Sequence, residues 1–311
     1  MIPGQVFALL TALCWAQNSL VYSHLGKKTG SDAVTHIRLW LALPLMVLIN
    51  FFFTGELIPQ TLPMKAVLFI LVSGFFGFFI ADLFLFRAFV EIGAREALVV
   101  MTTSPIFSLV LSWIFLKEIL SWIKIAGILI ILGGVIWVIF EENSYDKGEE
   151  HISVPRKDQH STLPGNRNIR GILYAFLGAI TQAVGLIFAK AGMEDGIHPV
   201  TTNLLRIAAG LIGLFAYSLI RKKVRSDFRS FTSPGLLLLL LFAVVVGPVL
   251  GIILSLYALN RAPVGIVTSL MQVSPIMLLP VDVFILKKKV SVKAVLGTLL
   301  AVCGAVLLFL Y

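Results

Sequence analysis

The sequence predicts an all-α integral membrane protein, with about ten transmembrane helices arranged as two inverted five-helix repeats. Of the 311 residues, 58% are hydrophobic and 13% are charged, whereas soluble chains carry roughly 25% charged residues. Ten apolar runs are long enough to cross the hydrocarbon core of a bilayer as helices, which takes about 20 residues each. An open sheet edge is not viable in lipid, so the spans are predicted to be helical.

The apolar runs fall into two groups of five. In chain order they cover residues 5–25, 33–53, 65–86, 95–116, 122–140, 169–190, 200–220, 234–258, 264–286 and 292–311. Residues 141–168 are rich in charges of both signs and poor in apolar side chains, as is typical of a flexible linker. We therefore divide the chain into a first repeat at 1–140, a polar linker at 141–168 and a second repeat at 169–311. Because five is odd, the second repeat must be inverted relative to the first.

A short motif occurs twice and sets the register of the repeats. Residues 101–107 read MTTSPIF and residues 271–277 read MQVSPIM, so Pro105 and Pro275 are 170 positions apart (275 − 105). The same offset pairs further residues without a gap: Gly77 with Gly247, Ala88 with Ala258, Leu116 with Leu286, and Gly134 with Gly304. Internal duplication of this size is typical of secondary transporters, whose sites lie where the repeats meet near the membrane midplane.

Polar and helix-breaking residues inside the apolar runs are the candidates for a cavity. A proline within a helix removes a backbone hydrogen bond and frees a carbonyl group, and polar side chains there can meet a solute. The predicted cavity-lining residues are Trp15, Gln17, Asn18, Thr103, Ser104, Pro105, Gln182, Ser269, Gln272, Ser274 and Pro275. Helix packing and hydrogen bonds between helices, without any substrate, are the alternative interpretation.

Three charged residues within the runs are candidates for coupling or charge recognition. An intramembrane carboxylate costs roughly 2.5 to 3.5 kcal/mol and is by default a functional hypothesis, so Asp82 is a candidate for proton coupling. An interfacial position, or pairing with Arg87 in the next turn, is the alternative. Arg38 and Arg206 are predicted either to meet a carboxylate of the substrate or of Asp82, or to extend toward the lipid headgroups.

The remaining composition predicts no cofactor, metal or nucleic-acid partner. The formal net charge is +9, but most Lys and Arg residues lie beside apolar runs, where they contact lipid headgroups and direct topology. Cys14 and Cys303 lie in opposite halves without a metal-binding spacing, and we interpret them as packing residues.

The ordered set of motifs resembles the drug/metabolite transporter superfamily, specifically the EamA-type bacterial transporters with ten helices. The resemblance rests on the duplicated unit, an arginine early in the second helix of each half, the alanine-rich segments 88–97 and 258–265, the Ser-Pro motif, and the segment 116–134. One departure is that Glu118 corresponds to Lys288 in the second half. The resemblance implies a secondary transporter in the bacterial inner membrane that exports small organic metabolites.

The predicted function is therefore transport of a small, amino-acid-like or related amphipathic solute by alternating access, with or without coupling to protons. The sequence has no GxxxxGK[ST] motif for ATP. A non-transporting membrane scaffold or sensor is the alternative. An intramembrane enzyme is not predicted, because Asp82 and Asp282 lie in FIAD and PVD contexts and HExxH is missing.

The orientation is predicted differently by two criteria. Connections after odd-numbered runs carry most of the Lys and Arg residues, including Lys27, Lys28, Arg221, Lys222 and Lys223. By the positive-inside rule these connections are cytoplasmic and both termini are outside. The family resemblance implies cytoplasmic termini instead.

Overall fold

The computed structural model describes residues 3–57, 59, 62–149, 166–274, 276–277 and 292–310. Within these ranges all regular secondary structure is helical, and the predicted all-α class is confirmed. Seven described segments are long and apolar enough to cross a membrane, and two shorter apolar helices accompany them. In and after the ninth predicted run, residues 275 and 278–291 are not described, so Pro275, Asp282 and Lys288 lie outside the described residues.

The first half contains five apolar helical segments, two of them subdivided. Its elements are α1 (Gly4–Thr29), α2 (Ser31–Thr54), α3 (Met64–Gly74), the π-helix η1 (Phe75–Ala81), α4 (Asp82–Glu91), α5 (Ala94–Met101), α6 (Ser104–Phe115) and α7 (Trp122–Glu149). The third span is the continuous run of α3, η1 and α4, and the fourth is α5 with α6. Gly30 and Gly55, with φ of 91° and 78°, end α1 and α2, because glycine adopts positive φ without a steric penalty.

The second half repeats this order. Its elements are α8 (Asn166–Met193), α9 (Pro199–Ile220), the short surface helix α10 (Val224–Arg229), α11 (Pro234–Val244), the π-helix η2 (Val245–Gly251), α12 (Ile252–Leu259), α13 (Val264–Met271) and α15 (Val292–Leu310). Prolines at the starts of α9 and α11 suit the first turn of a helix, where an N–H group would have no intrahelical partner.

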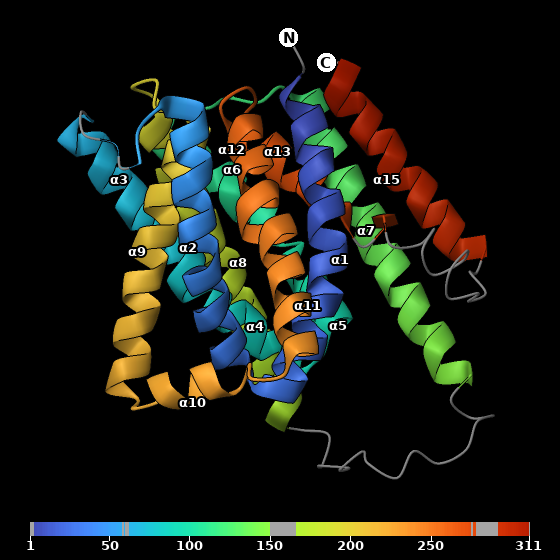
Figure 1. Cartoon of the computed structure of the whole chain (residues 1–311). Helices are drawn as coiled ribbons and strands as arrows, with labels where there is room; N and C mark the ends of the chain where they lie inside the picture. Colours follow the sequence, from blue (N-terminus) through green and yellow to red (C-terminus); the bar gives the residue numbers. More distant parts are fainter. Residues whose placement is uncertain are drawn as a thin grey trace.

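The internal repeat is visible in the backbone itself. The π-helices η1 and η2 begin at Phe75 and Val245 and end at Ala81 and Gly251, so both ends differ by the same 170 positions as the Ser-Pro motifs. In Figure 1, α1 begins beside the N-terminus at the top of the bundle, whereas α8 begins at the bottom. The two halves are therefore inverted relative to each other, as predicted.

The boundaries of the predicted linker fall partly on helices. Helix α7 continues to Glu149 and α8 begins at Asn166. Residues 150–165 lie outside the described residues. The division into 1–140, 141–168 and 169–311 therefore stays a prediction.

Helices α7 and α15 pack against each other through small residues. The pair lies beside the main bundle in Figure 1. A methyl group placed on Gly134 would lie 2.6 Å from the Ala301 backbone nitrogen and 2.7 Å from the Gly297 oxygen. Such separations are too short for any residue larger than glycine. Gly134, Gly297 and Ala301 thus let the two backbones approach closely.

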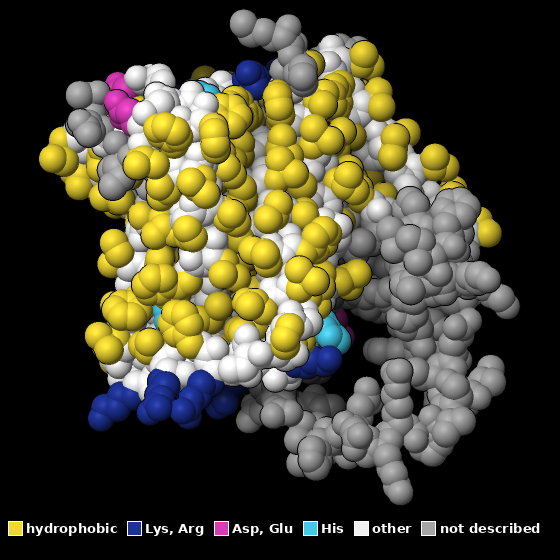
Figure 2. All heavy atoms as spheres, in the orientation of Figure 1, with side chains coloured by type: hydrophobic (Ala, Val, Ile, Leu, Met, Phe, Trp, Pro, Cys, Tyr) yellow, Lys and Arg dark blue, Asp and Glu magenta, His cyan; other side chains and the backbone are white. Residues whose placement is uncertain are grey.

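Hydrophobic and charged side chains occupy different parts of the protein surface. Figure 2 shows hydrophobic side chains over the flank of the bundle and Lys and Arg side chains gathered at its lower edge, near α10. The charged connection at this end includes Arg221, Lys222 and Lys223. Both chain termini lie at the opposite end. An apolar flank with charged ends is the surface that a multi-pass membrane protein presents to lipid and water.

Candidate functional site

A buried ion pair lies in the middle of the bundle. Arg38 of α2 is fully buried, and its Nη2 donates to the Asp82 carboxylate at the first residue of α4. Asp82 is itself only 4% exposed. The prediction that Arg38 meets Asp82 is thus confirmed, and snorkelling to the headgroups does not describe Arg38.

Arg206 approaches the same carboxylate from the other half. It lies on α9, is 3% exposed, and lines a small cavity together with Asp82. Its guanidinium carbon lies 5.2 Å from the centroid of the Phe78 ring, and that of Arg38 lies 4.7 Å from the Phe86 ring. The aromatic faces stabilise the two cations where water is excluded.

The cluster has more hydrogen-bond donors than acceptors. The Nε and Nη1 atoms of both Arg38 and Arg206 have no hydrogen-bond partner among the described residues, and neither does Nε1 of Trp15. Buried polar groups are normally satisfied. Two guanidinium groups face one carboxylate, so the site holds unneutralised positive charge and free N–H donors, the chemistry that binds an anion.

The cavity at this point is very small. Its volume is about 20 Å³, and it is lined from both halves by Trp15, Gly77, Phe78, Asp82, Gln182, Leu186, Arg206, Ile252, Ser255 and Met271. Four of these residues, Trp15, Gln182, Asp82 and Arg206, belong to the predicted site. A volume of this size is on the scale of a single water molecule, so a solute enters only if the helices move apart.

The other predicted residues lie away from this cavity. Gln17 and Gln272 are half-buried, and Ser104 and Ser274 are buried, but none of them lines it. Asn18 is buried on α1, and its amide has no hydrogen-bond partner among the described residues.

Hydroxyl groups near the Ser-Pro motif bond to their own helices. Thr103 donates to the Val100 oxygen at 2.7 Å, and Ser269 donates to the Gly265 oxygen at 2.6 Å. Pro105 lies in the first turn of α6. The fourth span is therefore interrupted between α5 and α6 at Thr102 and Thr103, where a proline costs no hydrogen bond.

Glycine brings η1 against the charged cluster. A methyl group on Gly77 would lie 3.0 Å from Nη2 of Arg206. The backbone of Gly77 is also close to Gly185 on α8, whose Cβ position is 3.0 Å from the Gly77 nitrogen. The π-helical turn, which is frequent at functional sites, thus places backbone directly beside the guanidinium.

Arg87 forms a separate contact at the lower end of the bundle. The alternative in which Arg87 pairs with Asp82 is wrong, because Arg87 donates instead to both oxygens of Asp32, at 3.1 and 3.2 Å. It also donates to the Tyr217 hydroxyl on α9. This contact, which we call the lower latch, joins the two halves of the chain.

A second contact joins the halves at the upper end. Lys190 on α8 forms an ion pair with Glu118 at 2.5 Å, and the other Glu118 oxygen accepts the Val264 backbone N–H at 2.9 Å. We call this the upper latch. Sequence reasoning singled out Glu118 only for its missing symmetric partner and did not find Lys190, because nothing in the sequence connects positions so far apart.

His36 and Asp227 form another buried contact that the sequence did not reveal. His36 Nδ1 lies 3.0 Å from an Asp227 oxygen, and the Trp40 indole donates to His36 Nε2 at 3.1 Å. Ser218 donates to the same Asp227 oxygen at 2.6 Å. These bonds hold α10 against α2 and α9. Within the described part of the chain, no three His, Cys, Asp or Glu side chains are placed to hold a metal ion.

A helical membrane bundle with a charged site buried between two inverted repeats defines a membrane transport protein. The model of the EamA-like transporter family matches residues 2–140 and 169–310, and the chain belongs to this family. The apolar helices of its described residues are those of a multi-pass membrane protein.

Two further comparisons agree with this assignment. An uncharacterized transporter of the archaeon Archaeoglobus fulgidus is 29% identical over 144 residues, which are 46% of this chain and 44% of that protein. The match thus spans less than half of the relative's length. A crystal structure with 16% sequence identity superposes with a TM-score of 0.70 over 99% of this chain and 96% of its own, and at this identity it shows the fold alone.

Proposed function

We propose that this transporter moves a small organic solute by binding its carboxylate between Arg38 and Arg206. The observation that carries the proposal is the imbalance of the buried cluster, in which two guanidinium groups share one carboxylate and keep unpartnered donors. Arginine presents a planar fork of donors that fits a carboxylate with two parallel hydrogen bonds. A solute carboxylate supplies both the missing charge and the missing acceptors.

The remaining cavity wall favours an amphipathic solute. Gln182, Ser255 and the Trp15 indole offer polar contacts, whereas Leu186, Ile252 and Met271 offer apolar ones. An amino acid or a related carboxylate with an apolar body matches this combination. A polyanion does not match the site, because two arginines and one aspartate leave the cluster with one uncompensated positive charge.

Alternating access is the mechanism that we assign to the transporter. The central cavity holds only about 20 Å³, and the lower and upper latches each join one half of the chain to the other. Release of one latch while the other stays formed would open the site to one side only. Rocking of inverted repeats around a fixed midplane site is the usual form of this motion.

Asp82 is the residue that we assign to proton coupling. A solute carboxylate that binds Arg38 competes with Asp82 for the same guanidinium. Asp82 would then be left in a dry site without its partner, where the neutral, protonated form of a carboxyl group is favoured. Solute and proton would therefore occupy the site together, and export in this form would be driven by the outward gradient of the solute.

Export from the cell is the direction that we propose, on the resemblance to the family, with the protein in the bacterial plasma membrane. The basic residues near α10 support an orientation with that end in the cytoplasm and the termini outside, because positive residues in short connections are retained on the cytoplasmic side. Labelling of a single cysteine introduced at Lys222 by a membrane-impermeant maleimide reports this orientation in whole cells. Protection of the cysteine until the cells are opened is the expected result.

Uptake into proteoliposomes tests the proposed function. Radiolabelled amino acids and other metabolites are offered to the purified protein with and without an imposed pH gradient, beside the Asp82→Asn variant. Saturable flux of a carboxylate solute that rises with the gradient and disappears in the variant is expected. Flux indifferent to both conditions would remove Asp82 from coupling, and the absence of flux for every compound would favour the scaffold or sensor alternative.

A further inference from the structure

A second, larger cavity lies on the flank of the bundle, away from the charged cluster. Its volume is about 430 Å³, within the range of small-ligand pockets. Residues of α3, the end of the fourth span and α8 line it: Lys65, Phe69, Leu111, Phe115, Leu116, Val184, Ile187, Phe188, Ala191 and Glu194. None of these residues lines the central cavity.

The cavity faces the membrane. Phe115 in its wall is 67% exposed, and its neighbours Trp113 and Ile114 on α6 are exposed as well. On the other side, Met64 and Leu68 of α3 are exposed. Side chains of this kind on a membrane-spanning helix lie in lipid, so the cavity opens sideways into the hydrocarbon layer.

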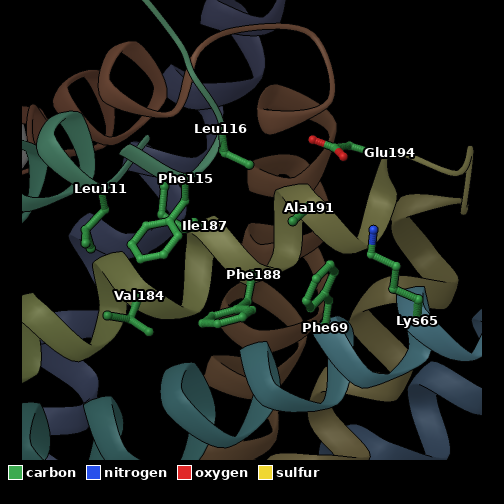
Figure 3. Close-up of a pocket in the computed structure, with 10 residues that line it drawn as sticks. All are labelled: Lys65, Phe69, Leu111, Phe115, Leu116, Val184, Ile187, Phe188, Ala191 and Glu194. Carbon is green, nitrogen blue, oxygen red and sulfur yellow. The ribbon is translucent and has the colours of Figure 1, made fainter. Parts of the chain in front are cut away.

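Two opposite charges mark one end of the cavity. Lys65 is the second residue of the span Met64–Glu91, and Glu194 follows directly on the span Ile169–Met193. Both charges therefore lie at the same membrane surface. Figure 3 shows the Lys65 ammonium and the Glu194 carboxylate at this end of the cavity, beyond the rings of Phe69 and Phe188.

Neither charge is neutralised within the described part of the chain. Lys65 contacts the Phe69 ring, with Nζ 5.7 Å from the centroid, and forms no ion pair with a described residue. Glu194 likewise has no described cationic partner. The nearby Lys190 is already held by Glu118 at 2.5 Å and by the Ala262 oxygen at 2.8 Å, so it does not serve Glu194.

We propose that this cavity is a binding site for a phospholipid with a zwitterionic, ammonium-bearing headgroup, namely phosphatidylethanolamine. An acyl chain fills the groove among the phenylalanine rings, the lipid phosphate binds Lys65, and the primary ammonium donates to Glu194. The carboxylate selects this headgroup over its neighbours for two reasons. The trimethylammonium of phosphatidylcholine has no N–H to donate, and phosphatidylglycerol brings a negative charge without a cation for Glu194.

Native mass spectrometry of the purified, delipidated protein tests the site. Equal amounts of phosphatidylethanolamine, phosphatidylcholine and phosphatidylglycerol with the same acyl chains are added, and retained adducts are compared. We expect phosphatidylethanolamine to be retained roughly fivefold over phosphatidylcholine, the preference that one exposed hydrogen bond from its primary ammonium to Glu194 can give. Equal retention of the three lipids would overturn the proposal.

Variants locate the binding and keep the test independent of transport. Glu194→Gln should reduce the preference for phosphatidylethanolamine over phosphatidylcholine to about one. Lys65→Met should lower the retention of all three lipids, because each of them presents a phosphate to Lys65. Lys117→Met and Asp195→Asn, exposed charges at the same surface that do not line the cavity, should leave both the preference and the retention unchanged. Ala191→Trp should displace the retained lipid, and Ala191→Ser should not. Lipid retention unaffected by Ala191→Trp would place the lipid elsewhere and overturn the proposal.

A competition experiment separates a lipid site from a solute site. Millimolar free amino acids should leave the retained phosphatidylethanolamine in place. Their displacement of the lipid would assign the cavity to the transported solute and contradict the proposal. Since neither measurement involves flux or the residues of the central cluster, failure of the lipid site leaves the proposed function untouched, and the reverse also holds.

Discussion

In the first half of the chain, the π-helix Phe75–Ala81 is followed by Asp82, whereas in the second half the matching π-helix Val245–Gly251 is followed by Ile252. Both halves contribute a buried arginine, Arg38 and Arg206. Among the described residues that line the central cavity, the carboxylate comes from the first half. The comparison shows that the backbone of the repeat has kept its symmetry, down to the irregular helical turns, while its charge has not.

This asymmetry gives the two arginines different roles. Arg38 is paired with Asp82 inside its own half, and Arg206 faces the same carboxylate only across the interface between the halves. A fully symmetric site with two carboxylates would be neutral and would have nothing to offer an anionic solute. The proposed binding of an anionic solute therefore depends on the absence of a carboxylate at Ile252.

Removal of the single carboxylate should have the largest effect. Asp82→Asn leaves two buried guanidinium groups without a counter-charge, which costs about 3–5 kcal/mol. We expect the apparent unfolding temperature in detergent to fall by roughly 10 °C, since 1 kcal/mol corresponds to about 2–4 °C in a chain of this size or somewhat smaller, and solute flux to disappear.

Moving the carboxylate from the first half to the second tests the same comparison in another way. Asp82→Ile combined with Ile252→Asp moves the carboxylate to the matching position of the second half, which also lines the cavity beside Arg206. The double variant should recover much of the unfolding temperature lost by Asp82→Ile alone. Equal instability of the single and double variants would show that the position of the carboxylate matters and the charge balance does not.

The two arginines should respond differently to neutralisation. Arg206→Gln removes a charge that has no ion-pair partner among the described residues, so the unfolding temperature should stay the same or rise. The half-saturating solute concentration should rise roughly 100-fold, which corresponds to the loss of one or two charge-assisted hydrogen bonds. Arg38→Gln should lower the unfolding temperature as well, because it breaks the ion pair with Asp82. Flux and thermal unfolding measured on both variants test this difference. Identical behaviour of the two variants would show that Arg38 and Arg206 do not have separate roles.

The two latches should affect the rate more than the affinity. Glu118 and Lys190 are 14% and 22% exposed at the side chain, and Asp32 and Arg87 are 19% and 22% exposed. Pairs of this exposure contribute about 1 kcal/mol or less. Glu118→Gln and Asp32→Asn should therefore change the maximal flux severalfold and leave the half-saturating concentration nearly unchanged. A large change in affinity would place these residues in the binding site.

The smallest effect concerns His198, at the upper end of α9. Burial lowers its pKa from the ordinary value of 6.5, and its Nδ1 accepts the Val200 backbone N–H at the start of the helix. Because the unfolded chain binds this proton more readily, the contribution of His198 to stability is present above pH 6.5 and is lost as the pH falls below it. His198→Asn keeps a capping acceptor and should flatten the dependence of unfolding temperature on pH between 5 and 7, relative to the unchanged protein.

The sequence predicted the fold because the length of each apolar run and the 170-residue offset between the repeats can both be read directly along the chain. It also predicted that Arg38 meets a carboxylate, since a buried charge in a membrane needs a partner. It did not predict η1 and η2, because FFGFFIA has no residue that distinguishes a π-turn from an ordinary helical turn, and Pro248 in VVGPVLG indicates an irregular turn without specifying its type. Nor did it find Lys190 or Asp227, whose partners lie in other spans. Contacts of that kind follow from helix packing, which one sequence does not display.

The central claim is that the solute binds through its carboxylate, and a matched pair of ligands tests it most directly. Once a transported acid is known, its binding to the purified protein is compared with that of the corresponding carboxamide, which keeps the shape and loses the charge. The account predicts binding of the acid, loss of at least tenfold in affinity for the amide, and no discrimination between the two in Arg206→Gln. Equal binding of acid and amide by the unchanged protein would contradict it.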